Sequence, residues 1–266
     1  MSEGPRRCMI TKARYGTMMH LTDTFIGGSF LAYGEYSENE VSVLRVYLRP
    51  GDTVVDVGAF IGDLTLPMAQ IVGRTGKVFA FEPDPLHFRI LCANMALNEI
   101  ENVEAIQAQA RTADSVPLNG LGRLRRFAID EMGLPNCRFI KVDTDGADRQ
   151  VLLSGKDTIT RCRPVLYVEN DVLENSAELI ETISELGYDA YWHLAPLFNP
   201  NNIRQNPTNI WGRNIISIMM LCLPRGGPFL PIGLPPVLGP QDQWCDLVPD
   251  ANGNPPKRIW PIKRPI

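Results

Sequence analysis

The sequence VVDVGAFIG, residues Val54–Gly62, decides the fold of this chain. It contains most of a β-branched run, Thr53–Val57, which predicts a buried strand. The two glycines that follow are typical of a turn into a helix, and the spacing of apolar residues predicts that helix over Gly62–Val72. In doubly wound α/β folds, a strand, a glycine turn and a helix in this order bind a nucleotide beyond the carboxyl ends of the strands.

The rest of the chain alternates short β-branched runs with helical spacing, which is typical of βα units on a mainly parallel sheet. We therefore expect an α/β fold with a single, doubly wound, mostly parallel sheet. Further strands are predicted over Lys77–Phe81, Asn102–Ile106, Arg138–Val142, Val165–Val168, Tyr188–His193 and Asn214–Leu223. Further helices are predicted over Pro85–Asn98, Ala147–Lys156 and Ser176–Leu186, the last ending at Gly187.

The two ends of the chain differ from this core, which we assign to residues 50–223. Residues 1–49 are expected to pack on the core, with strand or hairpin structure over Tyr15–Tyr33 that turns at Gly27-Gly28. Ser37-Glu38-Asn39-Glu40 has the form of a capping box and predicts a helix running toward Leu48. Half of the 22 prolines follow Leu223, so residues 224–266 are expected to form an irregular tail.

Composition narrows the class of protein. The net charge is −4, whereas duplex-binding domains are usually basic, so we expect no nucleic-acid partner. The N-terminal residues lack the apolar run of a signal peptide, and the longest apolar run, Ile215–Leu223, is too short to span a bilayer. Six scattered cysteines without a Cys-x-x-Cys pair favour reduced thiols and a cytoplasmic location. Self-association into a homo-oligomer is compatible with all of these features.

A carboxylate at the end of the second strand indicates which ligand the glycine turn accepts. Glu82 occupies the position where an acid binds the ribose hydroxyls of an adenosine. Dehydrogenases place Gly-x-Gly-x-x-Gly at this turn to bind a pyrophosphate, but here Phe60 fills that space. Asp56 and Asp63 would also repel phosphate, whereas they suit the positive sulfur of S-adenosylmethionine. The turn therefore favours S-adenosylmethionine over NAD.

Six separate stretches carry a resemblance to one family. They are Tyr33–Ser37, Pro50–Gly62, Ala80–Pro83, Ala93–Asn98, Phe139–Asp148 and Arg163–Glu169. Together they resemble the FkbM family of S-adenosylmethionine-dependent methyltransferases, over roughly residues 15–223. The resemblance implies a class I methyltransferase fold, Rossmann-like, with a seven-stranded sheet whose last strand is antiparallel. It also implies O-methylation of a hydroxyl on a sugar, polyketide or other natural product, with N-methylation as a variant, and thus a small-molecule or glycan acceptor.

The resemblance further implies which residues hold the cofactor. Acid and glycine positions at the turn are expected to line its methionine part, Glu82 its ribose, and Gln109 its adenine edge. For Ser37, helix capping is the competing interpretation. The expected cofactor contacts are Glu35, Ser37, Asp56, Gly58, Ala59, Gly62, Glu82, Pro83, Gln109 and Asp143.

Catalytic candidates cluster at the carboxyl ends of later strands. Asp143 and Asp145 are two residues apart, so an extended backbone points them to one side, and Glu169 ends the next strand. Three interpretations stay open: a divalent metal site, a carboxylate general base, or, for Asp145 and Asp148, acids at a helix N-terminus. His193 ends a strand at the same edge and is a further base candidate, with a structural role as the alternative. Lys141, inside the strand before Asp143, is interpreted as an ion-pair partner.

Two other functions remain open at this point, an NAD-dependent oxidoreductase and a non-catalytic binding module that keeps the fold. In the methyltransferase interpretation, the Asn- and Pro-rich loop Pro196–Arg213 and the residue after it contribute to the acceptor pocket. Ordinary turn chemistry is the competing interpretation of this loop. The expected acceptor contacts are Asn209, Trp211, Arg213 and Asn214.

Overall fold

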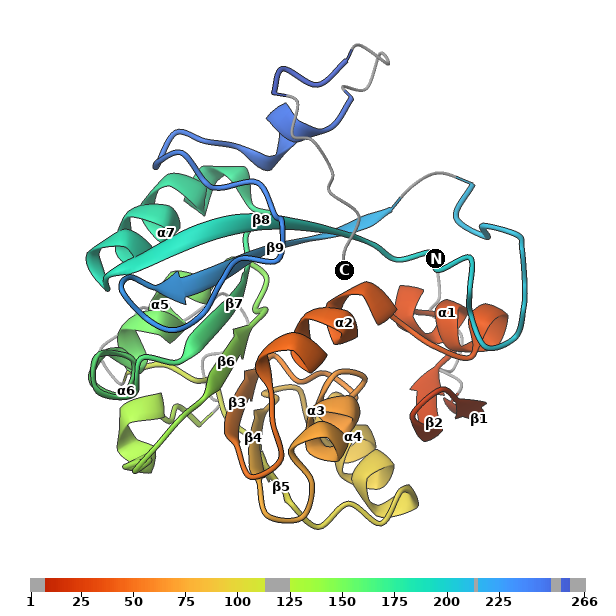
Figure 1. Cartoon of the computed structure of the whole chain (residues 1–266). Coiled ribbons are helices and arrows are strands. Elements are labelled where there is room, and N and C mark those ends of the chain that lie inside the picture. Colours follow the sequence, from red (N-terminus) through yellow and green to blue (C-terminus); the bar gives the residue numbers. More distant parts are fainter. Residues whose placement is uncertain (1–7, 113–124, 213–214, 250–254, 259–266) are drawn as a thin grey trace. The chain divides into compact units, whose positions relative to one another are not determined.

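The computed structural model describes residues 8–112, 125–212, 215–249 and 255–258 (Figure 1). It divides into two compact units. The first takes in the described residues of Met1–Gln109, Leu118–Arg125 and Pro196–Ile216. The second takes in those of Ala110–Pro117, Arg126–Ala195 and Ser217–Ile266. Arg213 and Asn214, expected to contact the acceptor, lie outside the described residues.

The first unit is built on three parallel strands: β3 Thr53–Val57, β4 Lys77–Phe81 and β5 Val103–Ile106. The register pairs Asp56 with Ala80 and Phe81 with Ile106, so the three strands end at one edge. The connecting helices are α3 Thr65–Val72 and α4 Pro85–Leu97. Asp84 caps α4, since its side chain accepts hydrogen bonds from Leu86 N and His87 N, a bond typical of an aspartate at that position.

The start of α3 differs from the prediction by three residues. The helix begins at Thr65, not Gly62, because Gly62 has a φ of 87° and lies outside helical geometry. A Cβ atom at Gly62 would lie 2.8 Å from Cδ1 of Leu91 and 3.0 Å from Cε of Met95. The glycine therefore allows the turn to approach α4 closely, as glycine does where no other residue fits.

The N-terminal segment was predicted incorrectly in part. A hairpin of β1 Cys8–Ala13 and β2 Gly16–Leu21 precedes a helix, α1 Phe25–Tyr33. The pair Gly27-Gly28 lies inside α1 and forms no turn, because Thr24 caps the helix by accepting a hydrogen bond from Gly27 N at 3.0 Å. A Cβ atom at Gly27 would lie 1.7 Å from Leu21 O. Glycine is thus required there by the close approach of α1 to the end of β2.

The helix α2, Glu38–Tyr47, begins where the capping-box spacing predicts, but the cap itself differs. Ser37 has a left-handed backbone with a φ of 49°. Its hydroxyl donates to the carboxylate of Glu40 and accepts no backbone N–H of the helix. Serine and glutamate still meet at this helix start, by a side chain-to-side chain bond.

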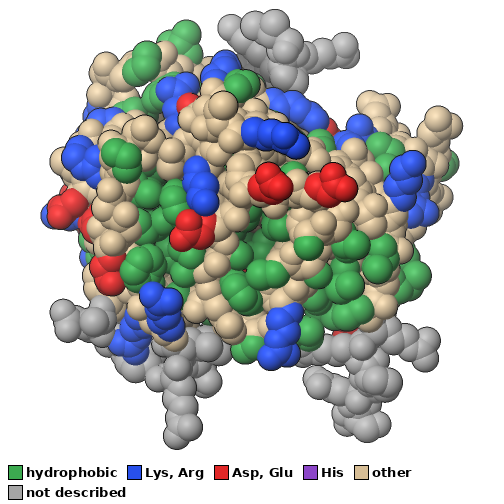
Figure 2. All heavy atoms as spheres, turned by 90° about the horizontal axis from the view of Figure 1, so that it is seen from below, with side chains coloured by type: hydrophobic (Ala, Val, Ile, Leu, Met, Phe, Trp, Pro, Cys, Tyr) green, Lys and Arg blue, Asp and Glu red, His purple; other side chains and the backbone are tan. Residues whose placement is uncertain are grey.

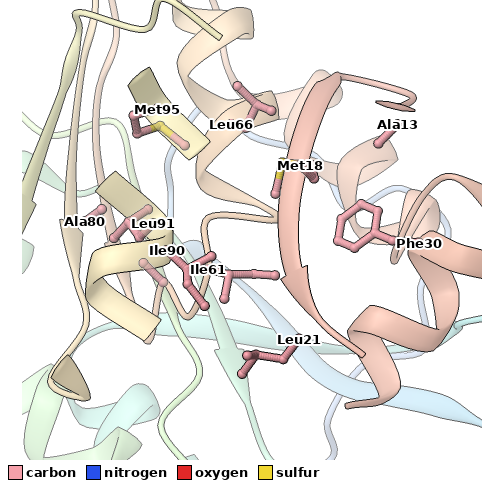
Figure 3. Close-up of a cluster of buried hydrophobic side chains, with 11 residues drawn as sticks. Ala13, Met18, Leu21, Phe30, Ile61, Leu66, Ala80, Ile90, Leu91 and Met95 are labelled. Atoms are coloured by element: carbon pink, nitrogen blue, oxygen red, sulfur yellow. The ribbon is translucent and has the colours of Figure 1, made fainter. Parts of the chain in front are cut away.

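Apolar side chains from these elements form one buried cluster in the first unit (Figure 3). Met18 of β2 and Phe30 of α1 share it with Ile61 of the glycine turn and with Leu91 and Met95 of α4. Leu91 and Ile61 are fully buried. The hairpin and α1 are therefore packed onto the same apolar core that supports the glycine turn.

The second unit carries the later strands and the tail. Its helices are α5 Asp148–Ser154, α6 Lys156–Cys162 and α7 Leu173–Glu185, with short 3-10 turns η1 Ile129–Met132 and η2 Trp244–Leu247. Its strands are β6 Phe139–Val142, β7 Val165–Glu169, β8 Tyr188–Pro196 and β9 Ile216–Pro224. The last residue of β8, Pro196, and the first residue of β9, Ile216, belong to the first unit. The single helix expected over Ala147–Lys156 is two helices that meet at Gly155, where a Cβ atom would lie 3.1 Å from Ile129.

The strand order in the sheet is β5-β4-β3-β6-β7-β9-β8. The pairs β3–β4, β4–β5 and β6–β7 are parallel and β7–β9 is antiparallel. This is the α/β, doubly wound, mostly parallel sheet that the sequence predicts, with the seven strands and the antiparallel last strand that the family resemblance implies.

The proline-rich tail contacts the outer strand, β8. Pro236 bridges Tyr191, Trp192 N donates to Pro235 O at 2.8 Å, and Val237 N donates to Ala190 O at 2.8 Å. Asp242 holds this segment, since its Oδ2 accepts from the Trp192 indole N–H at 3.1 Å and from Leu238 N at 2.9 Å. Within the described ranges, no helix has both the length and the apolar character needed to cross a bilayer.

Candidate functional site

Backbone hydrogen bonds connect the glycine turn to the neighbouring strand, β4. Gly58, with a φ of 77°, and Ala59 both donate their N–H to Phe81 O, at 3.0 and 2.9 Å. Phe60 follows with a left-handed φ of 47°, a conformation that is uncommon outside glycine and often marks a functional turn. The turn therefore has a fixed shape beside the end of β4.

Glu82 directly follows β4 and is oriented by two backbone donors. Its Oε2 accepts from Phe60 N at 2.9 Å and its Oε1 accepts from Asp84 N at 2.8 Å. The residue is only 6% exposed. Since a ribose recognition acid needs a fixed carboxylate, the arrangement suits adenosine binding. The ring of Phe60 lies 4.2 Å from that of His87, centroid to centroid.

Asp56 is fully buried, and its Oδ2 accepts a hydrogen bond from Thr65 Oγ1 at 2.6 Å. The carboxylate thus connects the end of β3 with the first residue of α3. Ala59 is also buried, at 3% exposure. Cofactor contact by either residue stays a prediction, and in this structure both support the turn.

Pro83 and Gln109 complete the predicted ribose and adenine positions. Pro83 follows Glu82 and is half-buried. Gln109 is 9% exposed, and its N–H donates to Arg125 O at 2.9 Å. Both residues lie within the first unit, where β4 and β5 end side by side in the register.

Glu35 connects the N-terminal segment to the loop that follows Pro196. Its Oε2 accepts from Arg14 Nε at 2.8 Å and from Ile203 N at 2.9 Å, and its Oε1 accepts from Asn199 Nδ2 at 2.7 Å. The carboxylate is 3% exposed. Glu35 thus has a structural role that the sequence does not indicate. Ser37 is hydrogen-bonded to Glu40. Contact of Glu35 or Ser37 with the cofactor stays a prediction.

The same loop is fixed to α1. Tyr33 Oη donates to Thr208 O at 3.1 Å and accepts from Ile210 N at 2.8 Å. Trp211 packs its ring 4.9 Å from Phe25, and Asn209 Oδ1 accepts from Trp211 N at 3.1 Å. Turn chemistry therefore accounts for Asn209, and the acceptor role of this loop stays a prediction.

In the second unit, Asp143 and Glu169 lie on neighbouring strands. Val142 pairs with Val168 in the parallel register, so the next residues, Asp143 and Glu169, follow at the carboxyl ends of β6 and β7. Lys141 is 3% exposed, and its Nζ lies 3.2 Å from Oδ2 of Asp143, whose side chain is 37% exposed. The predicted ion-pair role of Lys141 is confirmed.

Burial raises the pKa of Glu169 far above its usual range, and the negative charge of Asp143 and a hydrogen bond with its side chain add to the effect. Asp171 and Asp148 raise this pKa further. The Oε2 atom of Glu169 is shielded from solvent and has no hydrogen-bond partner among the described residues. Burial and the neighbouring negative charges therefore favour the protonated form of Glu169, which the sequence does not indicate.

Asp148 organises the loop after Asp143. Its carboxylate accepts from Thr144 N at 3.0 Å, Thr144 Oγ1 at 2.9 Å and Gly146 N at 3.2 Å. Burial raises its pKa to about 6, against the opposing effect of these bonds. Ala147, not Asp145, is the residue before α5. The helix-start interpretation therefore holds for Asp148 and is wrong for Asp145, which has a left-handed φ of 50°.

His193 is bonded to the sheet. Its Nδ1 lies 2.7 Å from the hydroxyl of Tyr167, which is fully buried. Burial lowers the pKa of His193 to about 4, so the ring is neutral at pH 7. This environment favours the structural interpretation, and a catalytic role stays a prediction.

A divalent metal site finds no support in the described part of the chain. No group of three or more His, Cys, Asp or Glu side chains there is arranged to hold a metal ion. At the carboxyl pair, Lys141 already lies against Asp143, where a cation would otherwise bind. The general-base interpretation of Asp143 and Glu169 is not tested by these contacts and stays a prediction.

Parts of the chain match known methyltransferase domains. Residues 30–120 match the TRM5/TYW2 methyltransferase domain, and residues 120–190 match the methyltransferase FkbM domain. Residues 120–190 are therefore similar to FkbM methyltransferases. S-adenosylmethionine is the methyl donor that this family implies, and the fixed Glu82 beside the glycine turn fits it.

Individual relatives of this chain have diverse assignments. A Methanosphaera stadtmanae protein assigned as ribosomal RNA small subunit methyltransferase A is 36% identical over 79 residues, 29% of this chain and 28% of the relative. A Sulfolobus acidocaldarius protein assigned as cobalt-precorrin-6B C(15)-methyltransferase is 27% identical over 159 residues, 58% of this chain and 73% of the relative. The chain therefore spans less than a third of the first relative's length.

Among solved structures, the methyltransferase FkbM of Methylobacillus flagellatus is similar with a TM-score of 0.46 and 14% identity. The alignment covers 66% of this chain and 44% of that protein.

Proposed function

We propose that this chain transfers a methyl group from S-adenosylmethionine to a hydroxyl group of a small-molecule or glycan acceptor. The observation that carries the proposal is the Glu82 carboxylate, which backbone N–H groups of Phe60 and Asp84 orient beside the glycine turn. An acid so held suits the two ribose hydroxyls of an adenosine. The two methyltransferase domain matches, which together run from residue 30 to 190, favour the methyl donor over NAD.

In this mechanism the chain binds, aligns and deprotonates. When bound, S-adenosylmethionine supplies a methyl group attached to a positively charged sulfur, and this sulfur is the leaving group that keeps the electron pair of the carbon–sulfur bond. Alignment of the acceptor oxygen against that methyl group supplies much of the rate. The oxygen forms the new bond to carbon with its lone pair, and its proton passes to a carboxylate, which we assign to Asp143. General base catalysis of this kind typically contributes roughly a hundredfold to ten-thousandfold.

Calorimetry with the full chain tests the cofactor assignment. We expect binding of S-adenosylmethionine and none of NAD. Glu82→Gln should weaken S-adenosylmethionine binding roughly tenfold to a hundredfold, because hydrogen bonds to a charged group contribute about 1.5–3 kcal/mol. Glu104→Gln is the matched control, since Glu104 lies on the neighbouring strand with its side chain 55% exposed. Binding of NAD, or equal binding by Glu82→Gln and wild type, contradicts the assignment.

The acceptor class is tested with isotope-labelled methyl donor and mass spectrometry. Labelled product from a panel of hydroxyl-bearing sugars and polyketides supports the proposal. Loss of that label in Asp143→Asn, with S-adenosylmethionine binding retained, supports the base assignment. Full turnover in Asp143→Asn and in Glu169→Gln removes it.

RNA is the second candidate acceptor. It is favoured by the TRM5/TYW2 domain match and by the assignment of a relative as a ribosomal RNA methyltransferase, so the expected absence of a nucleic-acid partner does not stand as a conclusion. On the face seen in Figure 2, Lys and Arg side chains are spread among Asp and Glu side chains, whereas RNA-binding surfaces gather positive charge. Label found in RNA, and absent from small hydroxyl acceptors, would replace the first candidate with the second.

A further inference from the structure

We propose that Lys141 is a positioning residue that fixes the single proton of the Asp143–Glu169 pair on Glu169 and so leaves Asp143 as the base. This inference rests on the proposed function. It adds the arrangement of charge that sets the pH at which the base is active.

The geometry begins with the register of the two strands. Lys141 pairs with Tyr167, and the residues two positions further on are Asp143 and Glu169. Because side chains two apart on a strand share a face, Tyr167 and Glu169 share one face of β7, and Asp143 directly follows the end of β6. The Nζ atom of Lys141 lies 3.2 Å from Oδ2 of Asp143.

The two carboxyl groups differ in their surroundings. The side chain of Asp143 is 37% exposed and has the Lys141 ammonium beside it. Glu169 has its Oε2 shielded from solvent without a partner, and its pKa is raised by burial first and by Asp143, Asp171 and Asp148 next. An opposite charge at this distance stabilises a carboxylate, whereas burial disfavours one.

Two adjacent carboxyl groups in a partly buried site cannot both ionise readily. The pair therefore carries one proton, which burial of Glu169 and the ammonium of Lys141 beside Asp143 together keep on Glu169. Lys141 is buried at 3% exposure, so water screens its charge little. Asp171 also has a raised pKa, caused first by burial and then by Asp145 and Asp143, which makes the ammonium the balancing charge of an acidic neighbourhood.

The chemical step then balances without a further reactant. The acceptor O–H bond breaks and its proton passes to ionised Asp143. The oxygen lone pair forms the bond to the methyl carbon, and the carbon–sulfur electron pair stays on sulfur. Glu169 keeps its proton throughout, and Asp143 returns its proton to solvent, to which it is partly exposed.

The test uses the full chain with Lys141→Met and Lys141→Arg. In wild type, the rising limb of kcat against pH should report ionisation of the pair. Lys141→Met should move this limb to higher pH, because it removes the positive charge beside Asp143. Lys141→Arg keeps the charge and should restore the profile to within about half a unit, while KM for S-adenosylmethionine stays unchanged in both. Lys77→Met is the matched control, because Lys77 pairs with Glu104 at 3.3 Å on an exposed surface.

A second readout is independent of turnover. Infrared titration follows the carbonyl band of the protonated carboxyl group, which Glu169→Gln should abolish at neutral pH. Asp143→Asn should lower the midpoint of that band by roughly 1 pH unit or more, because it removes the neighbouring charge. This measurement also holds if Lys141→Met fails to fold.

The outcomes separate the inference from the function on which it rests. A chain that binds no S-adenosylmethionine refutes the proposed function, while the infrared titration still decides the proton arrangement. An unchanged pH profile in Lys141→Met, or a band midpoint that Asp143→Asn does not move, overturns the inference. A shifted profile that Lys141→Arg restores supports it.

Discussion

Replacement of Gly62 by alanine should destabilise the protein more than the same replacement at a positive-φ glycine where an added Cβ atom contacts nothing. Gly62 has a φ of 87°, and an added Cβ would lie 2.8 Å from Cδ1 of Leu91. Gly133 has a left-handed backbone with a φ of 58° and nothing within 4 Å of an added Cβ. Both variants therefore place an alanine on a left-handed backbone, but only Gly62→Ala also forces two atoms together.

The magnitude follows from these two contributions. A left-handed backbone costs an L-residue roughly 1–2 kcal/mol, which applies to both variants. Alanine recovers about 0.4–1 kcal/mol by restricting the unfolded chain. Overpacking against Leu91, which is fully buried, adds roughly 1–3 kcal/mol in Gly62→Ala alone. We expect a loss of about 2–4 kcal/mol for Gly62→Ala and about 1 kcal/mol for Gly133→Ala.

Urea unfolding followed by circular dichroism measures both losses against wild type. The difference between the two variants isolates the steric contribution, since the strain of a positive φ is common to both. A second variant, Leu91→Val, shortens the side chain that an alanine at 62 would meet. In the double variant with Gly62→Ala, the combined loss should be smaller than the sum of the single losses. Equal losses for Gly62→Ala and Gly133→Ala would refute the assignment of Gly62 to close helix packing.

Two further predictions concern the second unit. Burial lowers the pKa of His193 to about 4, so between pH 4 and 6.5 the unfolded chain binds more protons, and the free energy of unfolding falls as the pH is lowered. From pH 7.5 to 5 this contribution falls by about 2 kcal/mol. In urea unfolding at these two pH values, His193→Gln should therefore lose less stability than wild type by about the same amount. Equal losses in the two proteins argue against a buried neutral ring. Asp242→Ala should cost about 1–3 kcal/mol and make the segment around Leu238 sensitive to protease, because Asp242 accepts from Trp192, Leu238 and Arg258. Asp189→Ala, at an exposed ion pair with Arg225, should cost little, and an equal protease sensitivity of these two variants speaks against the anchoring role.

The central part of the fold was predictable because its signals are local. The run Thr53–Val57 is a buried strand, and the glycines that follow it have the positive φ values that favour glycine at a turn. The neighbouring ends of β6 and β7 also follow from pattern, since parallel strands in such a sheet end at one edge. The approach of Asp143 to Glu169 could therefore be expected before any contact was known.

Other features depend on contacts that no local pattern carries. Glu35 bonds to Asn199 and Ile203 from a distant part of the sequence. The propensity of Gly27-Gly28 for a turn is overridden by the Thr24 cap and by the close approach to Leu21. Burial decides the protonation of Glu169 and the neutral state of His193, and burial is a property of the folded chain.

The contact of Pro235–Val237 with β8 has a consequence for how this protein can be handled. β8 is the last strand in the order of the sheet, and an uncovered outermost strand offers unpaired N–H and C=O groups to other chains. Trp192 N and Ala190 O bond instead to the tail, and the prolines of that tail cannot template another strand, because they lack a donor. A truncated protein ending at Leu223 would therefore expose the outer edge of β8. We expect this truncated protein to precipitate, with its affinity for the cofactor unchanged.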